Sequence, residues 1–283
     1  MILLRCDRHA SFRGHTLEVS ITLYTFPVSH FAEKVRWLLD YSGIPYQVVN
    51  WVPVIHAPAA YWLSGKRTVH FVVVSDGSKK VTVHDSTQII EWVHQNFDQL
   101  ELMPGDEKTY HEAMALEDQA DSFGDDVIRY MYAPMLEQPE DFIQVWGWES
   151  RKIYRHLLRS GLPAIRMLLD RYLDFSNQGR EAGLSRLHDF FASLDLRLEG
   201  QQEFLVGDQL SIADISVASL LAPVYAPDTH PVYGSTVFRR SLAAQHAEFS
   251  GYASFRWMQH LYGKYRLRRA SKTASYRMSQ SHS

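Results

Sequence analysis

Hydrophobic residues near the start of the chain follow two different periods. The run VSITLYTF at 19–26 is rich in β-branched and aromatic residues and predicts a buried strand. Over 29–41 the apolar residues recur at helical spacing, and Gly43 and Pro45 then end the predicted helix. PYQVVNW at 45–51 predicts a second strand. The pattern therefore indicates a strand–helix–strand unit.

A hairpin and a further helix are predicted next. In TVHFVVVSDGSKKVTVHD, two β-branched runs flank the turn signal at 75–78. DSTQIIEWVHQNF is amphipathic, with Asp85 as its expected N-cap and Gln88 at capping-box spacing. This helix is expected to end near Phe97.

The second half of the chain has almost no strand-like pattern. Asp214 stands in capping-box relation to Ser211, and Leu210 and Ile215 are spaced to form a hydrophobic staple. Helices are predicted over 108–136, 139–158, 162–175, 180–199 and 211–221. The predicted fold class is thus an α+β domain of the order βαβ-ββα, followed by an all-α helical bundle domain.

The same pattern predicts where the domains begin and end. The last twenty residues hold six Lys or Arg and no acidic residue, which predicts a basic flexible tail. The expected parts are an irregular extension at 1–18, an α/β domain at 19–97, a linker at 98–107, a helical domain at 108–263 and the tail at 264–283.

Composition narrows the class of protein. The 283 residues are 46% hydrophobic and 22% charged, with a formal net charge of -3, which is typical of a soluble globular protein and does not favour nucleic acid as a partner. No apolar run approaches the ~20 residues that span a bilayer, so no membrane partner is expected. The N-terminus does not read as a signal peptide, and the single cysteine, Cys6, excludes an intramolecular disulfide. A cytoplasmic location is expected.

Metal binding is not expected from the sequence. His70 and His84 fall in the two strands of the predicted hairpin, but two histidines without a third fixed ligand make a weak site.

Four stretches in this order carry a resemblance to a known family. They are LYTFPVSHFAEKVRWLLDYSGIPY, TVHFVVVSDG, VHDSTQIIEWV and FLVGDQLSIADISVASLL. The sequence resembles the glutathione S-transferase superfamily, whose members have a thioredoxin-like domain followed by a helical one. HPVY at 230–233 is also similar to a feature of some bacterial members. The likeness is clear over residues 20–97, looser over 108–203, and clear again from there to about 221.

The resemblance implies a site for the thiol of glutathione. Ser29 opens the first helix seven residues before Arg36, as in the Ser/Cys-type members, and is the implied catalytic residue. Tyr24 is an alternative, because some classes use a tyrosine at the end of the first strand. Serine in place of cysteine favours conjugation over thiol–disulfide exchange. Ser29 also suits a plain N-cap role, and His30 is expected to be exposed beside it.

Further residues are implied to hold the rest of glutathione. Asp85 and Ser86 match the acid–serine pair that binds the glutamyl end, and the backbone of Val69 would pair with the cysteinyl part. The candidates for the glycyl carboxylate are His56, Lys66 and Arg67. The implied partners are glutathione as co-substrate, a small hydrophobic electrophile and a second copy of the chain in a homodimer.

One position departs from the family. Where the family has a cis proline before its third strand, this chain has His70, and a cis bond before a non-proline residue costs ~2.5–4 kcal/mol. Either the Val69–His70 bond is trans and alters the backbone contact with glutathione, or it is cis and stores strain. The alternative function is accordingly a protein of this fold that binds a partner without turnover.

Overall fold

A four-stranded sheet forms one side of the molecule. The computed structural model describes residues 20–52, 71–75, 79–97, 102–199 and 202–266. Within these, the sheet has the order β2-β1-β3-β4, with β1 parallel to β2 and antiparallel to β3, and β3 antiparallel to β4. The strands are β1 (Ser20–Thr25), β2 (Gln47–Asn50), β3 (Phe71–Ser75) and β4 (Lys80–His84).

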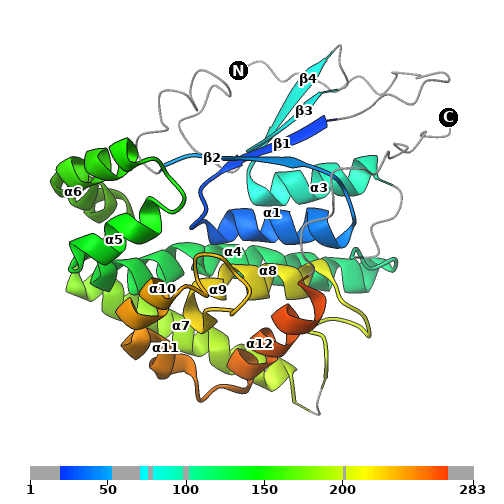
Figure 1. The fold of residues 1–283 in the computed structure, drawn as a ribbon. Coiled ribbons are helices and arrows are strands. Elements are labelled where there is room, and N and C mark those ends of the chain that lie inside the picture. The colour runs from blue at the N-terminus through cyan, green and yellow to red at the C-terminus, as the bar shows by residue number, and fades with distance from the viewer. Residues whose placement is uncertain (1–19, 53–70, 76–78, 98–101, 200–201, 267–283) are drawn as a thin grey trace.

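Helices α1 (His30–Tyr41) and α3 (Ser86–Asn96) cover one face of this sheet (Figure 1). Leu23 and Val72 on adjacent strands are buried on that side, as the alternation of a half-covered strand requires. Helix α1 is buried on nearly all sides, because it lies between the sheet and helix α8 (Ile212–Leu220) of the helical part. The predicted order βαβ-ββα followed by helices is confirmed.

The helical part is built around one long helix, α4 (Glu107–Leu136), which packs against α7 and α8. The capping box predicted for α8 is present: both Ser211 N–H and Ser211 Oγ–H donate to Asp214 Oδ2, at 2.8 and 2.9 Å. The remaining helices are α5 (Pro139–Trp146), α6 (Lys152–Leu173), α7 (Asn177–Arg197), α9 (Ala222–Tyr225), α10 (Thr236–Ser241), α11 (Ala243–Phe249) and α12 (Ala253–Tyr265).

Two helix predictions in this part were wrong. The predicted helix at 139–158 is broken after Trp146, and Glu149 adopts a left-handed φ of 55° in the connection. The predicted start at 162 lies inside α6, which passes through Pro163 without a break. A proline removes only one backbone bond, and buried Leu162 and Ile165 hold the helix to the core on either side of it.

The end of the described chain also differs from expectation. Helix α12 continues to Tyr265, and the next residue, Arg266, has a side chain that is only 12% exposed. The first residues of the expected flexible tail are thus an ordered part of the helical domain.

Candidate functional site

The starts of α1 and α3 lie at the same edge of the sheet. Across the three neighbouring strands, Tyr24 pairs with Phe71 and Phe71 pairs with His84. Because β1 and β4 are both antiparallel to β3, they run in the same direction and end at this common edge. Ser29 and Asp85 follow these two ends, so the two helix N-termini are neighbours with the start of β3 between them.

Ser29 is the N-cap of α1, as predicted. Its Oγ accepts the N–H of Ala32 at 3.1 Å, and the residue is only 7% exposed. Arg36, seven residues further on, donates from a guanidinium nitrogen to the carbonyl oxygen of Phe26 at 3.2 Å. The Ser–Arg spacing therefore brings Arg36 back to the turn that leads into Ser29.

Asp85 and Ser86 occupy the start of α3. Asp85 caps the helix through its carboxylate, which accepts the N–H of Thr87 at 3.0 Å, whereas Gln88 at the expected capping-box position is exposed. The backbone of Asp85 has φ 70° and ψ 139°, a region that favours glycine. Strain of this kind at a non-glycine residue is concentrated at ligand sites and switches. Ser86 is 3% exposed.

Tyr24, the alternative hydroxyl, packs against other aromatic rings. Its ring stacks on Phe71 with centroids 4.9 Å apart and lies 5.2 Å from the ring of Trp51. Since side chains alternate along a strand, Tyr24 lies on the face opposite to Leu23 and α1. The structure thus gives Tyr24 an aromatic packing role.

The expectation that His30 is exposed was wrong. The residue is 2% exposed and its ring lies 4.5 Å from that of Phe31. The first turn of α1 faces the helical domain rather than solvent, so the residue after the cap is covered.

Several implied site residues lie outside the described part of the chain. These are His56, Lys66, Arg67, Val69 and His70, together with Cys6. The residues that the structure brings together at the sheet edge are thus Ser29, Asp85 and Ser86.

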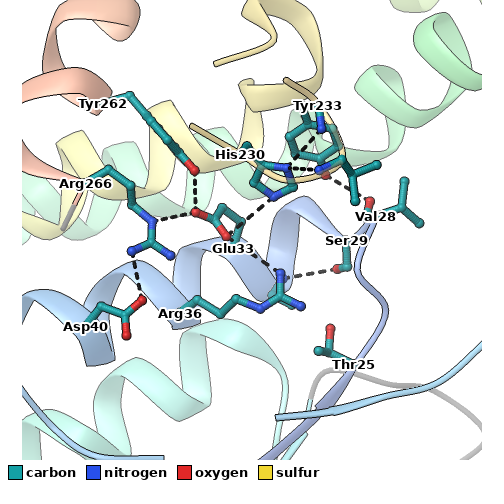
Figure 2. A network of polar contacts seen from close by, with 12 residues as sticks. Thr25, Val28, Ser29, Glu33, Arg36, Asp40, His230, Tyr233, Tyr262 and Arg266 are labelled. Atoms are coloured by element: carbon teal, nitrogen blue, oxygen red, sulfur yellow. Dashed lines mark hydrogen bonds and ion pairs between the residues drawn. The ribbon is translucent and has the colours of Figure 1, made fainter. Parts of the chain in front are cut away.

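Sequence reasoning missed a buried charge cluster around Glu33, one turn after Ser29 (Figure 2). Glu33 Oε1 accepts from Arg266 Nε at 2.6 Å and from the hydroxyl of Tyr262 at 2.7 Å. Glu33 Oε2 lies 3.7 Å from His230 Nε2 and 3.7 Å from an Arg36 nitrogen. In the sequence, only the HPVY segment at 230–233, which contains His230, drew attention to a member of this cluster.

The charge states in this cluster follow from burial and pairing. Burial alone would raise the pKa of Glu33, but Arg266 and the other neighbouring bases outweigh it and lower the pKa to about 2. Burial lowers the pKa of His230 to about 3, partly opposed by Glu33. At neutral pH the cluster therefore holds an ionised Glu33 and a neutral His230.

A second buried charge cluster joins α1 to α3 and α4. Lys34 Nζ lies 2.5 Å from Glu117 Oε1 and 2.5 Å from Asp121 Oδ1, and the side chains of Lys34 and Glu117 are fully buried. Thr87 Oγ donates to Glu117 Oε1 at 2.9 Å. Because Thr87 directly follows Ser86, this cluster fixes the start of α3 against α4.

We expect the stability of the protein to fall in mild acid because of His230. Its folded pKa of about 3 lies below the unfolded value of 6.5, so stability is present above pH 6.5 and is lost as the pH falls towards 3. In a His230→Asn variant, whose amide oxygen can replace the Nδ1 acceptor, this loss should be absent. Between pH 7.5 and 4.5 the free energy of unfolding of the wild type should drop by about 2.7 kcal/mol more than that of the variant.

Denaturant titrations of both proteins at pH 7.5 and 4.5 measure the two drops in unfolding free energy. Groups that titrate alike in the wild type and the variant contribute equally to both drops and cancel when one is subtracted from the other. Equal pH dependence in the two proteins would contradict a buried neutral His230.

The described residues contain neither a candidate metal site nor a candidate membrane-spanning helix. Within them no group of three or more His, Cys, Asp or Glu side chains is arranged to hold a metal ion. No helix among them has both the length and the apolar character needed to cross a membrane.

Comparison with known proteins agrees with this fold. The family model "Glutathione S-transferase, N-terminal domain" matches residues 23–101, and "Glutathione S-transferase, C-terminal domain" matches residues 177–249. The two matches together cover more than half of the chain and lie in the expected order. The chain belongs to the glutathione S-transferase superfamily.

The individual proteins that match the chain have low sequence identity to it or match only part of it. The chain is 33% identical over 87 residues to prostaglandin E synthase 2 of Mus musculus, a match that spans 31% of this chain and 22% of that protein. FzlA from C. crescentus has a similar structure, with a TM-score of 0.54 and 17% identity over 84% of this chain and 91% of its own. A glutathione S-transferase from Methylobacterium radiotolerans, in complex with glutathione sulfonate, is similar with a TM-score of 0.51 and 18% sequence identity. That match covers 84% of this chain and 93% of the other. At these identities the solved structures show the fold.

Proposed function

We propose that this protein binds glutathione at the shared edge of the sheet and holds its thiol as a thiolate for attack on a small hydrophobic electrophile. The observation that carries the proposal is the pairing of two helix N-termini at one edge, Ser29 on α1 and Asp85–Ser86 on α3. The proposal includes a homodimer and a cytoplasmic setting, as the family resemblance implies.

The chemistry requires a selective stabilisation of the thiolate. Lowering a thiol pKa from ~8.5 by two units takes about 2.7 kcal/mol. The N-terminus of α1 would contribute ~0.3–1 kcal/mol through its N–H groups and dipole. A hydrogen bond from the Ser29 hydroxyl to the charged sulfur would contribute ~1.5–3 kcal/mol. The Ser29 oxygen accepts the cap bond from Ala32, and a hydroxyl that accepts can also donate its proton.

The other end of glutathione has complementary groups at α3. Its glutamyl carboxylate would lie at the helix start, against the Ser86 hydroxyl and backbone N–H. Its ammonium group would pair with the Asp85 carboxylate. The strained backbone of Asp85 supports this assignment, because it turns the start of α3 at the point where the ligand would bind.

We expect Ser86→Ala and Ser29→Ala to separate binding from activation. Calorimetric titration of the wild type with reduced glutathione should give a Kd between micromolar and millimolar. Ser86→Ala should weaken binding about tenfold, the effect of one lost hydrogen bond to a charged group. Ser29→Ala should bind within about threefold of wild type but lower turnover about 10–100-fold, because the thiol is no longer held as a thiolate.

A matched control is available for the cap. Ser176 is the N-cap of α7 and accepts the N–H of Gly179 at 3.1 Å, so Ser176→Ala removes the same kind of bond at an exposed position of the helical domain. It should leave binding and turnover unchanged. No heat of binding at millimolar glutathione would contradict the proposal and favour the alternative of a partner-binding protein without turnover.

A further inference from the structure

The peptide bond that leads into Ser29 is held by two tyrosines of the helical domain. The carbonyl oxygen of Val28 accepts the hydroxyl of Tyr233 at 2.9 Å (Figure 2). It also accepts the hydroxyl of Tyr132, at 3.3 Å. Tyr132 comes from α4 and Tyr233 from the HPVY segment, and both residues are buried, at 2% and 0% exposure. Two donors from distant parts of the chain thus converge on one backbone oxygen.

Holding this oxygen also fixes the position of Ser29. The peptide unit is planar, so the Val28 oxygen and the Ser29 nitrogen cannot move independently. At the other end of the turn, the carbonyl oxygen of Phe26 accepts from Ser29 N at 3.2 Å and from Arg36 at 3.2 Å. The direction in which the Ser29 side chain leaves the backbone is therefore set by contacts at both ends of the turn.

Tyr233 is itself held in place by His230. The two rings stack with centroids 3.9 Å apart and an interplanar angle of 14°. His230 Nδ1 accepts the backbone N–H groups of Val232 and Tyr233, at 3.2 and 3.0 Å, which places the imidazole proton on Nε2, the nitrogen that faces Glu33. The chain of contacts from Glu33 through His230 and Tyr233 ends at the residue before Ser29.

We propose that Tyr233 and Tyr132 are positioning residues that aim the Ser29 hydroxyl at the thiol. This inference rests on the proposed function and adds residues from the helical domain to it. A reacting or stabilising group displaced by about 1 Å can lose on the order of a hundredfold in rate. The hydroxyls of both tyrosines bond Val28, beside Ser29, whereas glutathione is proposed to be anchored at Asp85 and Ser86. Removing the hydroxyls should therefore change the pKa of the thiol and leave the affinity for glutathione nearly unchanged.

The test uses Tyr132→Phe, Tyr233→Phe and the double variant in the full chain, since phenylalanine keeps the packing and removes only the hydroxyl. The first readout is the pKa of glutathione bound to each protein, followed by the ultraviolet absorbance of its thiolate. The second is kcat and KM with glutathione and a nitro-activated aryl halide. Each single variant should have a small effect, because the other hydroxyl still holds the oxygen. The double variant should raise the bound thiol pKa by about one unit and lower kcat about tenfold, with KM for glutathione within twofold.

Tyr225→Phe is the matched control. Tyr225 is also fully buried and donates its hydroxyl to a backbone carbonyl, that of Ala218, at 2.9 Å. Its hydroxyl bonds Ala218 and not the Val28 oxygen, so Tyr225→Phe should lower stability, as the loss of one buried hydrogen bond does, without changing the thiol pKa or kcat.

The outcomes distinguish the two proposals. If the double variant keeps the wild-type thiol pKa and kcat, or if Tyr225→Phe changes them equally, the positioning role is overturned while the proposed function stands. If the wild type binds no glutathione, the proposed function fails and the positioning role fails with it.

Discussion

Replacing Lys34 with methionine is expected to lower the free energy of unfolding by about 3–5 kcal/mol at neutral pH. Methionine has a similar length but no charge, so the substitution leaves the buried carboxylate of Glu117 and the partly buried carboxylate of Asp121 without their cation. Removing one partner of a buried ion pair is costly because the other partner remains desolvated. Chemical denaturation of the two proteins measures the loss.

Two companion variants test this explanation. In Lys34→Met/Glu117→Met the buried carboxylate that faces Lys34 is removed as well, and most of the lost stability should return. Arg197→Met breaks an exposed ion pair with Glu112, whose side chains are 39% and 46% exposed, and should cost less than about 1 kcal/mol. If the double variant is no more stable than Lys34→Met, the loss comes from packing and the electrostatic explanation is wrong.

Acidic pH provides a second check on the same variant. Burial and the neighbouring Asp121 raise the pKa of Glu117, and Lys34 opposes that rise. Without Lys34 the carboxyl should take up a proton at higher pH and become neutral. The stability gap between wild type and Lys34→Met should therefore narrow as the pH is lowered.

Glu33→Gln is expected to lower the free energy of unfolding by about 3 kcal/mol. Glutamine has the same shape and its oxygen can still accept the Arg266 Nε–H, but it has no negative charge to neutralise the guanidinium that Glu33 bonds at 2.6 Å. We place the loss at the lower end of the range for buried pairs because Arg266 keeps a second partner, Asp40, at 2.8 Å. Thermal and denaturant unfolding of both proteins measure the effect.

The exposed Glu112→Gln is the control for this substitution, since it removes the same charge where solvent screens it. Removing both partners in Glu33→Gln/Arg266→Met should recover part of the loss. A Glu33→Gln variant as stable as Glu112→Gln would show that the cluster around Glu33 contributes little to folding.

Local signals in the sequence predicted the local structure well. The caps of α1 and α8 depend on residues within three positions of one another, and both were found as predicted. The start of α3 was also placed correctly, although its cap bond goes to Thr87. Pro163 shows the limit of such signals, because packing of the residues on either side kept α6 intact where the local pattern predicted a break.

The charged residues of α1 could not be placed in the same way. Glu33 and Lys34 look in the sequence like part of a solvated helix face, yet both are buried, because α1 lies between the sheet and the helical domain. Their partners are far along the chain: Glu117 is 83 positions from Lys34, and Tyr262 is 229 positions from Glu33. No periodicity or spacing rule connects residues so far apart.

The contact between Glu33 and Arg266 has a consequence for how the protein is made. It joins residues 233 positions apart, and closing a loop of that length costs chain entropy before the contact can compensate for it. While the chain emerges from the ribosome, N-terminal segments fold before later ones exist. Glu33 therefore has only its local partner Arg36 until α12 and Arg266 have been synthesised, and the N-terminal domain gains its full set of ion pairs only after that point.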